Sequence, residues 1–143
     1  MYFADSGLAA HLLGFESARM LEKSTFFSPL HENLVASEIV KAQINAGRKK
    51  ELYYFRDSRG LEVDFLVRGS GHRLFLLEVK ATRTIRPEAA EPISRPKKTV
   101  TGYVAEAFIV HLPSESLLPR SPVRPGVRAI SVRDIADTIS GGL

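Results

Sequence analysis

Apolar positions between residues 28 and 47 recur with the period of an amphipathic α-helix. Ser28 suits the N-cap, and Gly47 supplies the C-terminal stop. One face of this helix gathers a largely apolar set of positions. These are Glu32, Val35, Ala36, Ile39 and Gln43. Glu32 is therefore predicted to face the core, whereas Glu38 lies well off that stripe and is predicted to be a flanking surface group.

Five further runs have the apolar character of strands and are bounded by turn-forming residues. They are residues 52–55, 62–67, 73–80, 107–112 and 127–130. Turns are predicted at 57–60 and 69–71. A short first helix capped by Asp5 and a final helix capped by Ser131 complete the pattern. This order of elements predicts an α/β or α+β protein in which helices pack on a sheet.

The second and third strands are predicted to pair as an antiparallel hairpin. One register makes a whole face of the hairpin apolar, which is the kind of match that fixes a register. Its apolar pairs are Val63 with Val79, Phe65 with Leu77 and Val67 with Phe75. The other face pairs Asp64 with Glu78, Glu62 with Lys80 and Leu66 with Leu76. A slip by two residues would keep both faces and change only the partners.

Two segments in the second half of the chain are predicted to be loops. Residues 81–100 are basic and broken by prolines, and they are expected to contain a helical turn or two. Residues 113–126 are expected to form a long loop, since proline and serine recur through them.

Composition narrows the class of protein. The 143 residues have the length of a single domain, and 20 basic against 16 acidic residues give a net charge of +4, which permits a polyanionic partner. The lack of cysteine excludes disulfides, thiolate metal sites and cysteine nucleophiles. No run is apolar enough to span a membrane, and no secretory signal is visible. A cytoplasmic protein without a membrane partner is therefore predicted.

The polar face of the hairpin offers candidate chemistry. Glu78 and Lys80 are two residues apart on one strand, so their side chains point the same way, and Asp64 faces Glu78. Facing carboxylates repel each other unless a cation lies between them, and oxygen ligands suit Mg²⁺ or Mn²⁺. Glu32 can complete the metal shell, and Lys80 can orient a metal-bound water. These residues make a candidate phosphodiester-cleaving site.

A surface ion pair is the simpler interpretation of carboxylates beside a lysine, and spacing alone favours it. Two details favour a site instead. Glu78 ends the strongly apolar run 74–77 rather than an evidently exposed strand. Glu32 occupies the apolar stripe of its helix, where an unpaired charge would be costly.

Residues 61–66 followed by 77–80 resemble the D…(D/E)xK signature of the PD-(D/E)XK, or restriction-endonuclease-like, superfamily. More narrowly, the chain is similar to the uncharacterised domain at the C-terminus of many prokaryotic AAA-type ATPases. The similar segments are residues 2–8, 31–38, 52–56, 62–65 and 78–80. The resemblance covers residues 1–82 well and the remainder only in general layout. Val63 departs from the proline that such nucleases can carry before the aspartate.

This resemblance implies a restriction-endonuclease-like mixed sheet flanked by helices, with Asp64, Glu78 and Lys80 on the hairpin and Glu32 on the preceding helix. In active members these positions bind Mg²⁺ and activate water for phosphodiester hydrolysis. The implied partner is a nucleic acid, with DNA favoured over RNA. An N-terminal ATPase module is also implied, so residues 1–143 are expected to be one domain of a larger protein. The chain has no GxxxxGK[ST] loop, and no ATP site is predicted in it.

Other features leave alternatives open. The basic residues can form a phosphate-binding surface or a solvated surface of mixed sign. They are residues 48–50, Arg56, Arg59, Arg68, Arg73, Arg83, Arg86, Arg95, Lys97 and Lys98. The aromatic run 53–55 can supply a stacking ring, although a strand with one face in the core is favoured. His31 is predicted to be a surface histidine at a helix end, and no histidine metal site is expected.

Three hypotheses of function follow from these observations. The first is a PD-(D/E)XK-like, divalent-metal-dependent nuclease or a descendant of one. The second is a non-catalytic accessory module on the same fold that binds nucleic acid or protein, with its carboxylates and lysine simply paired. The third is a purely structural ATPase accessory domain that mediates oligomerisation.

Overall fold

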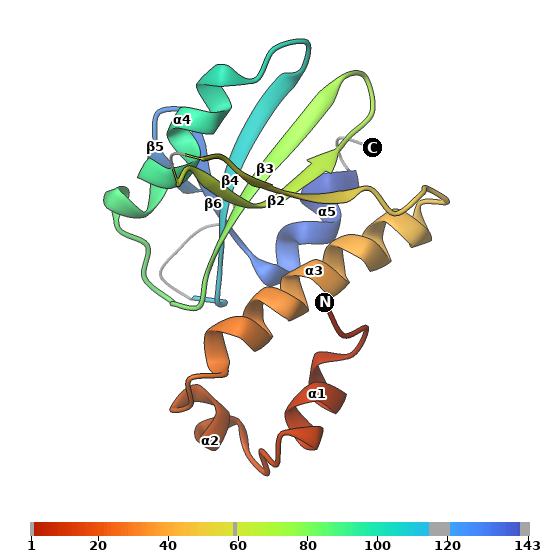
Figure 1. Ribbon diagram of the computed structural model, residues 1–143, viewed down its shortest axis with the longest axis vertical. Helices are drawn as coiled ribbons and strands as arrows, with labels where there is room; N and C mark the ends of the chain where they lie inside the picture. The colour runs from red at the N-terminus through yellow and green to blue at the C-terminus, as the bar shows by residue number, and fades with distance from the viewer. Residues whose placement is uncertain (1, 59, 115–120, 141–143) are drawn as a thin grey trace.

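A mixed sheet of six strands runs through the described part of the chain, in the order β1-β2-β3-β4-β6-β5 (Figure 1). The structure is a computed structural model, and it describes residues 2–58, 60–114 and 121–140. The strands are β1 Leu52–Arg56, β2 Glu62–Arg68, β3 Arg73–Lys80, β4 Val104–His111, β5 Ser121–Arg124 and β6 Val127–Ser131. The first three strands form an antiparallel meander, β3, β4 and β6 run parallel, and β5 returns antiparallel to β6.

Helices cover both faces of this sheet. They are α1 Ser6–Leu12, α2 Ala18–Glu22, α3 Phe27–Asn45, α4 Glu91–Thr99 and α5 Ile135–Ser140, with short 3₁₀ turns η1 Pro87–Ala90 and η2 Val132–Asp134. Helices α3 and α5 lie on one face and α4 on the other, while α1 and α2 lie beyond α3, away from the sheet (Figure 1). The predicted mixed sheet flanked by helices is confirmed.

Two apolar cores follow from this layering. The larger lies between the sheet and helices α3 and α5, and includes Phe65, Phe75, Phe108 and Ile39. The smaller lies under α4, where Leu76, Ile93 and Ile109 are fully buried. Alternation along the strands sends successive side chains into one core and then the other. The strand β3 is therefore apolar on both faces, as the run Leu74 to Leu77 predicted.

Helix α3 has the predicted buried face and a different start. Val35, Ala36, Ile39 and Gln43 are buried as expected. The helix begins at Phe27, so the prediction of Ser28 as its N-cap is wrong. A turn through residues 24–26 leads straight into the helix, and the carbonyl of Phe26 already accepts the amide of Leu30 at 2.9 Å.

The hairpin has the predicted register over its apolar half. Phe65 pairs with Leu77, Leu66 with Leu76 and Val67 with Phe75. Regular pairing with β3 ends at Phe65, so the predicted pairs of Glu62, Val63 and Asp64 with β3 are wrong. At this point β2 also carries one extra residue relative to β1. Tyr53 faces Leu66, whereas Phe55 faces Val63. This bulge turns Val63 into the core under α4, away from the face that holds Phe65.

The second half of the chain is more regular than predicted. Residues 87–99, expected to be mostly loop, form η1 and α4. Pro92 lies in the first turn of α4, where its missing N–H costs nothing, and Ile93 and Pro96 pack against the sheet. The predicted loop 113–126 contains β5 at its end, while residues 115–120 lie outside the described residues. The caps expected at Asp5 and Ser131 are confirmed by hydrogen bonds.

Candidate functional site

The C-terminal end of strand β3 places two of the predicted residues together. Glu78 is buried, with 6% of its surface exposed, and Lys80 is half-buried at the end of the strand. The Lys80 Nζ donates to the Glu78 Oε1 at 2.7 Å. The C-terminal ends of β3 and β4 point toward the first half of α3 (Figure 1). These side chains therefore lie where strand and helix residues can meet.

Asp64 lies in the β2 bulge and faces the same region. Its Oδ2 accepts the backbone N–H of Val79 at 2.7 Å, in place of a regular strand contact. Burial raises the pKa of Asp64 to about 6, and the hydrogen bond from Val79 opposes that rise. The charges of Glu78 and Glu32 raise the pKa further, whereas Lys80 lowers it. Asp64 is thus within electrostatic reach of all the other predicted site residues.

Glu32 reaches this region from α3, and Tyr2 holds it there. The Tyr2 hydroxyl donates to Glu32 Oε1 at 2.7 Å, and the Tyr2 ring packs on Phe65 with 5.7 Å between ring centroids. Burial, followed by the hydrogen bond and charge of Glu32, raises the pKa of Tyr2 above its ordinary value. Glu32 is half-buried rather than a full core residue, and this phenol is its hydrogen-bond partner.

Asn33 explains why Tyr2 can reach Glu32. Its side chain accepts from the backbone amide of Phe3 at 2.6 Å and donates to the Phe3 carbonyl at 3.1 Å and to Ser6 Oγ at 2.8 Å. The segment before α1 is therefore fastened to α3. Sequence reasoning assigned no role to Tyr2 or Asn33, although both lie in the segments that carried the resemblance.

The four predicted residues gather at one end of the sheet, but each carboxylate already has a partner. Glu78 is paired with Lys80, Glu32 with Tyr2 and Asp64 with the amide of Val79. Among the described residues, no group of three acidic or histidine side chains is arranged to hold a metal ion. Their donor chemistry nevertheless suits Mg²⁺ or Mn²⁺, and their mutual repulsion at Asp64 is the kind that a cation relieves.

A buried histidine pair borders this region. His31 has 4% of its surface exposed, so the prediction of a surface histidine is wrong. Burial lowers the pKa of His31, and His111 adds to the effect. His111 ends β4 directly beside Lys80 in the parallel register. The signal for burial was available, since His31 precedes Val35 by four residues and so shares its helix face.

Glu38, the rival acid on α3, takes no part in the site. It is half-buried and forms an ion pair with Lys41, one turn further along the same helix. The prediction of a flanking surface acid is confirmed.

The aromatic run on β1 departs from the favoured prediction. Tyr53, Tyr54 and Phe55 are 51%, 54% and 38% exposed, so none belongs to a strand core. β1 is an edge strand, and in its burial pattern only Leu52 is partly buried. The periodicity of a sequence predicts which residues share a face of a strand. It does not predict whether another element covers that face.

The basic residues divide into paired and unpaired groups. Arg56, Arg68, Arg73 and Arg83 each face an acidic side chain, as a surface of mixed sign predicts. In contrast, the exposed Lys49 and Lys50 form no ion pair within the described part of the chain. Arg59 lies outside the described residues.

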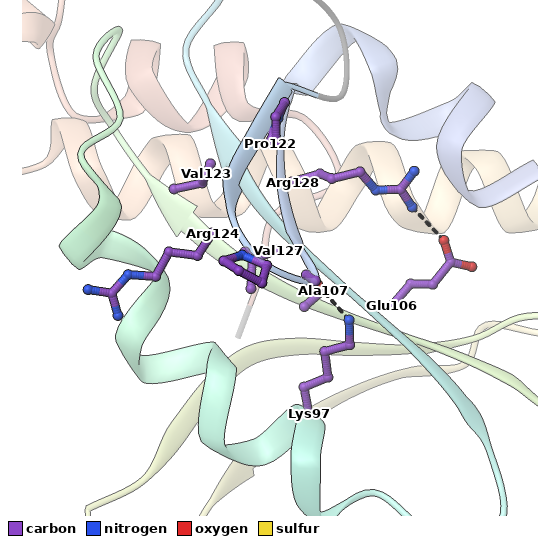
Figure 2. Close-up of a pocket in the computed structure, with 10 residues that line it drawn as sticks. Lys97, Glu106, Ala107, Pro122, Val123, Arg124, Val127 and Arg128 are labelled. Atoms are coloured by element: carbon purple, nitrogen blue, oxygen red, sulfur yellow. Dashed lines mark hydrogen bonds and ion pairs between the residues drawn. The ribbon is translucent and has the colours of Figure 1, made fainter.

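One cavity lies away from the carboxylates. It measures about 730 Å³ and lies where α4 meets the β5–β6 turn (Figure 2). Lys97 donates to the Gly126 carbonyl at 2.5 Å, and Arg128 donates to Glu106 at 2.6 Å. Figure 2 shows Arg124 pointing away from that pair. The polar groups here fasten neighbouring elements together. A second cavity of about 470 Å³ adjoins Glu32 and is lined mainly by apolar residues on either side of α1 and at the start of α3.

Residues 27–132 match the family model described as Domain of unknown function (DUF4143). The chain belongs to this family. The DUF4143 match contains Glu32, Asp64, Glu78 and Lys80, whereas Tyr2 precedes it. No curated protein matches the chain. Within the described residues, no helix combines the length and the apolar character needed to cross a membrane. The DUF4143 description assigns no activity, so any function must be argued from the site itself.

Proposed function

We propose that this domain is a divalent-metal-dependent nuclease of the restriction-endonuclease-like, PD-(D/E)XK type. The observation that carries the proposal is the meeting of Asp64, Glu78, Lys80 and Glu32 at the point where β2 leaves its regular pairing with β3. Acids outnumber bases there, and burial raises the pKa of Asp64, with the charges of Glu78 and Glu32 adding to the rise. Such crowding at a place where a strand is distorted is more typical of a functional site than of a surface ion pair.

The proposed chemistry divides roles among these residues. Asp64 and Glu78 would hold Mg²⁺ or Mn²⁺, and Glu32 would complete the shell directly or through a water. When bound, such a cation neutralises phosphate charge and makes a coordinated water more acidic. Lys80 would orient the attacking water and stabilise the negative charge that develops on the phosphate. Attack forms one P–O bond, and the bond to the leaving sugar oxygen breaks.

The proposed partner is a nucleic acid, with DNA favoured over RNA, and the proposed context is the C-terminal part of an AAA-type ATPase. The net charge of +4 and the unpaired Lys49 and Lys50 support a polyanionic partner. The ATPase context rests on the sequence resemblance. ATP would bind in that other module, since this chain carries no phosphate-binding loop.

One observation favours a second candidate, a non-catalytic module that binds nucleic acid or protein. The Glu78–Lys80 contact of 2.7 Å and the separate partners of Asp64 and Glu32 give a self-contained set of polar contacts. A domain that had lost catalysis could keep this arrangement for its stability alone.

The deciding experiment compares wild type, Asp64→Asn and the control Glu38→Gln. Cleavage of labelled single- and double-stranded DNA is followed in Mg²⁺ and in Mn²⁺, and Mn²⁺ binding is measured by calorimetry. We expect Asp64→Asn to lose at least about 100-fold in rate and to lose metal binding, with Glu38→Gln unchanged. Thermal unfolding of each variant checks the fold. Equal cleavage by all three proteins, or no heat with Mn²⁺ for wild type, overturns the nuclease proposal.

A further inference from the structure

The exposed aromatic residues of β1 lie beside the candidate site and have no role in the chemistry above. Tyr54 is 54% exposed and stands in the middle of an edge strand. Exposed aromatic side chains that are adjacent on one strand present a contiguous apolar surface, which is typical of an interaction site.

The two faces of β1 meet different surroundings. Leu52 packs against the core under α3, whereas Phe55 lines a small cavity with Val63, Leu76 and Pro96 on the α4 side. Because side chains alternate along a strand, Tyr54 and Arg56 lie on the α3 side with Leu52. Tyr53 lies on the opposite face with Phe55. The same strand thus carries two similarly exposed tyrosines that point in opposite directions.

Tyr54 lies opposite the β2 bulge that holds Asp64. Its two neighbours on β1, Tyr53 and Phe55, pair with Leu66 and Val63 on either side of that bulge. Tyr2 donates to Glu32 and packs on Phe65. Tyr54 and the 47%-exposed Tyr2 therefore form an aromatic border along one side of the site.

The charge around this border favours an anionic ligand that also offers flat rings. Lys49 and Lys50 lead into β1 and are exposed, and the Arg56 side chain is 64% exposed with only a loose contact of 4.0 Å to Glu62. Aromatic faces interleaved with basic side chains are the usual means of holding single-stranded nucleic acid, since bases stack on rings while phosphates meet cations. In a duplex the base faces are hidden in the stack.

We propose that Tyr54 stacks on an unpaired base next to the phosphate held at the carboxylate site, so that the domain selects single-stranded or frayed nucleic acid. This inference rests on the proposed function for the identity of the ligand as a nucleic acid. Arg56 and the two lysines contact the backbone of the same strand. Tyr53, on the other face, takes no part.

The test measures binding without cleavage. Fluorescence anisotropy follows a labelled oligothymidylate of about 12 nucleotides in EDTA, and again with Ca²⁺ in place of Mg²⁺. We expect Tyr54→Ala to weaken binding about 5- to 100-fold, Tyr54→Phe to bind like wild type, and the matched control Tyr53→Ala to change Kd by less than about 2-fold. Duplex DNA and an abasic strand should bind weakly and be indifferent to Tyr54→Ala.

Several results would overturn the inference. These are no binding by wild type, equal losses for Tyr53→Ala and Tyr54→Ala, and an equal effect of Tyr54→Ala on duplex and single strand. A dimer that light scattering detects and that Tyr54→Ala disrupts would assign the border to a second copy of the chain instead. Failure of the nuclease proposal gives a different result, since a protein that never cleaves would still show the Tyr54-dependent binding.

Discussion

The charged clusters at the two ends of strand β3 have opposite balances of acids and bases. At its start, Arg73 and Arg128 both donate to Glu106, and their guanidinium groups lie 5.3 Å and 4.8 Å from the ring centroids of Phe75 and Phe108. At its end, Asp64, Glu78 and Glu32 share the neighbourhood of Lys80. Cations are in excess at the first cluster and acids at the second. The first arrangement lets every charged group find a partner within the fold, whereas the second leaves repulsion that a cationic ligand would relieve.

The largest expected effect contrasts the first and last residues of β3. Lys80→Ala should lower Mg²⁺-dependent cleavage at least about 100-fold, because it removes the charge that orients water and stabilises the phosphate in the proposed reaction. Arg73→Ala should leave the rate within about 2-fold. Initial rates on one labelled substrate measure both. A larger loss from Arg73→Ala than from Lys80→Ala would place the chemistry at the other end of the sheet.

For the free energy of unfolding, the larger loss is expected from a change near the start of β3 and the smaller loss from a change at the candidate site. Glu106→Ala leaves two half-exposed arginines without their shared acceptor, so the free energy of unfolding should fall by about 2 kcal/mol. Glu32→Gln keeps an acceptor for Tyr2 and removes one charge from a crowded region, so it should change stability by less than about 0.5 kcal/mol. Urea unfolding of both variants gives the comparison. A greater loss from Glu32→Gln would show that the acid cluster is itself a stabilising network.

The pH dependence of stability should reveal the raised pKa of Asp64, which burial and the neighbouring acids cause. A folded-state pKa of about 6, above the ordinary value of 3.8, means that the folded protein holds this proton more tightly than the unfolded chain does. The stabilisation is complete below about pH 4 and is lost as the pH rises through about 6. Allowing for solvent screening, wild type should lose about 2 kcal/mol across that range relative to Asp64→Asn.

The measurement is urea unfolding at a series of pH values without divalent metal. Added Mg²⁺ should restore part of the lost stability at neutral pH in wild type and little in Asp64→Asn. If the free energies of unfolding of the two proteins changed with pH in parallel, the raised pKa would not belong to Asp64.

A small effect on both stability and cleavage is expected for Tyr2→Phe. This change removes the hydrogen bond to Glu32 and keeps the ring that packs on Phe65, so stability should fall by about 0.5 kcal/mol. Cleavage should fall only a few-fold, since Tyr2 positions Glu32 and holds no phosphate itself. Restored activity at higher Mg²⁺ would agree with this role. A complete loss of activity would show that the phenol acts on the substrate directly.

Sequence patterns predicted the framework of the site because apolar pairing is a strong constraint. The pairs Phe65–Leu77 and Val67–Phe75 fixed the hairpin register, and the two-residue spacing of Glu78 and Lys80 fixed their common direction. The apolar stripe of α3 correctly turned Glu32 toward the sheet.

What the patterns missed depends on contacts between distant segments. The bulge that turns Val63 away from Phe65 has no signature in an unbroken alternation of residues. The hydrogen bond from the Phe3 amide to Asn33, which brings Tyr2 to Glu32, joins residues that are thirty positions apart in the sequence. Helix α4 was missed for another reason, since prolines that usually break helices lie here in its first turn and on its buried face.

The two carboxylate oxygens of Asp64 have different surroundings. One of them holds the hairpin together through its contact with Val79. One carboxylate oxygen, Oδ2, satisfies the backbone N–H that the bulge leaves without a strand partner. The proposed metal would bind the other oxygen, Oδ1. An asparagine at this position would keep the first contact through its amide oxygen and lose the charge. Replacing one oxygen of Asp64 by an amide nitrogen would thus remove the proposed metal ligand and keep the hydrogen bond to Val79. Related domains could lose the proposed reaction by this one change and keep the fold.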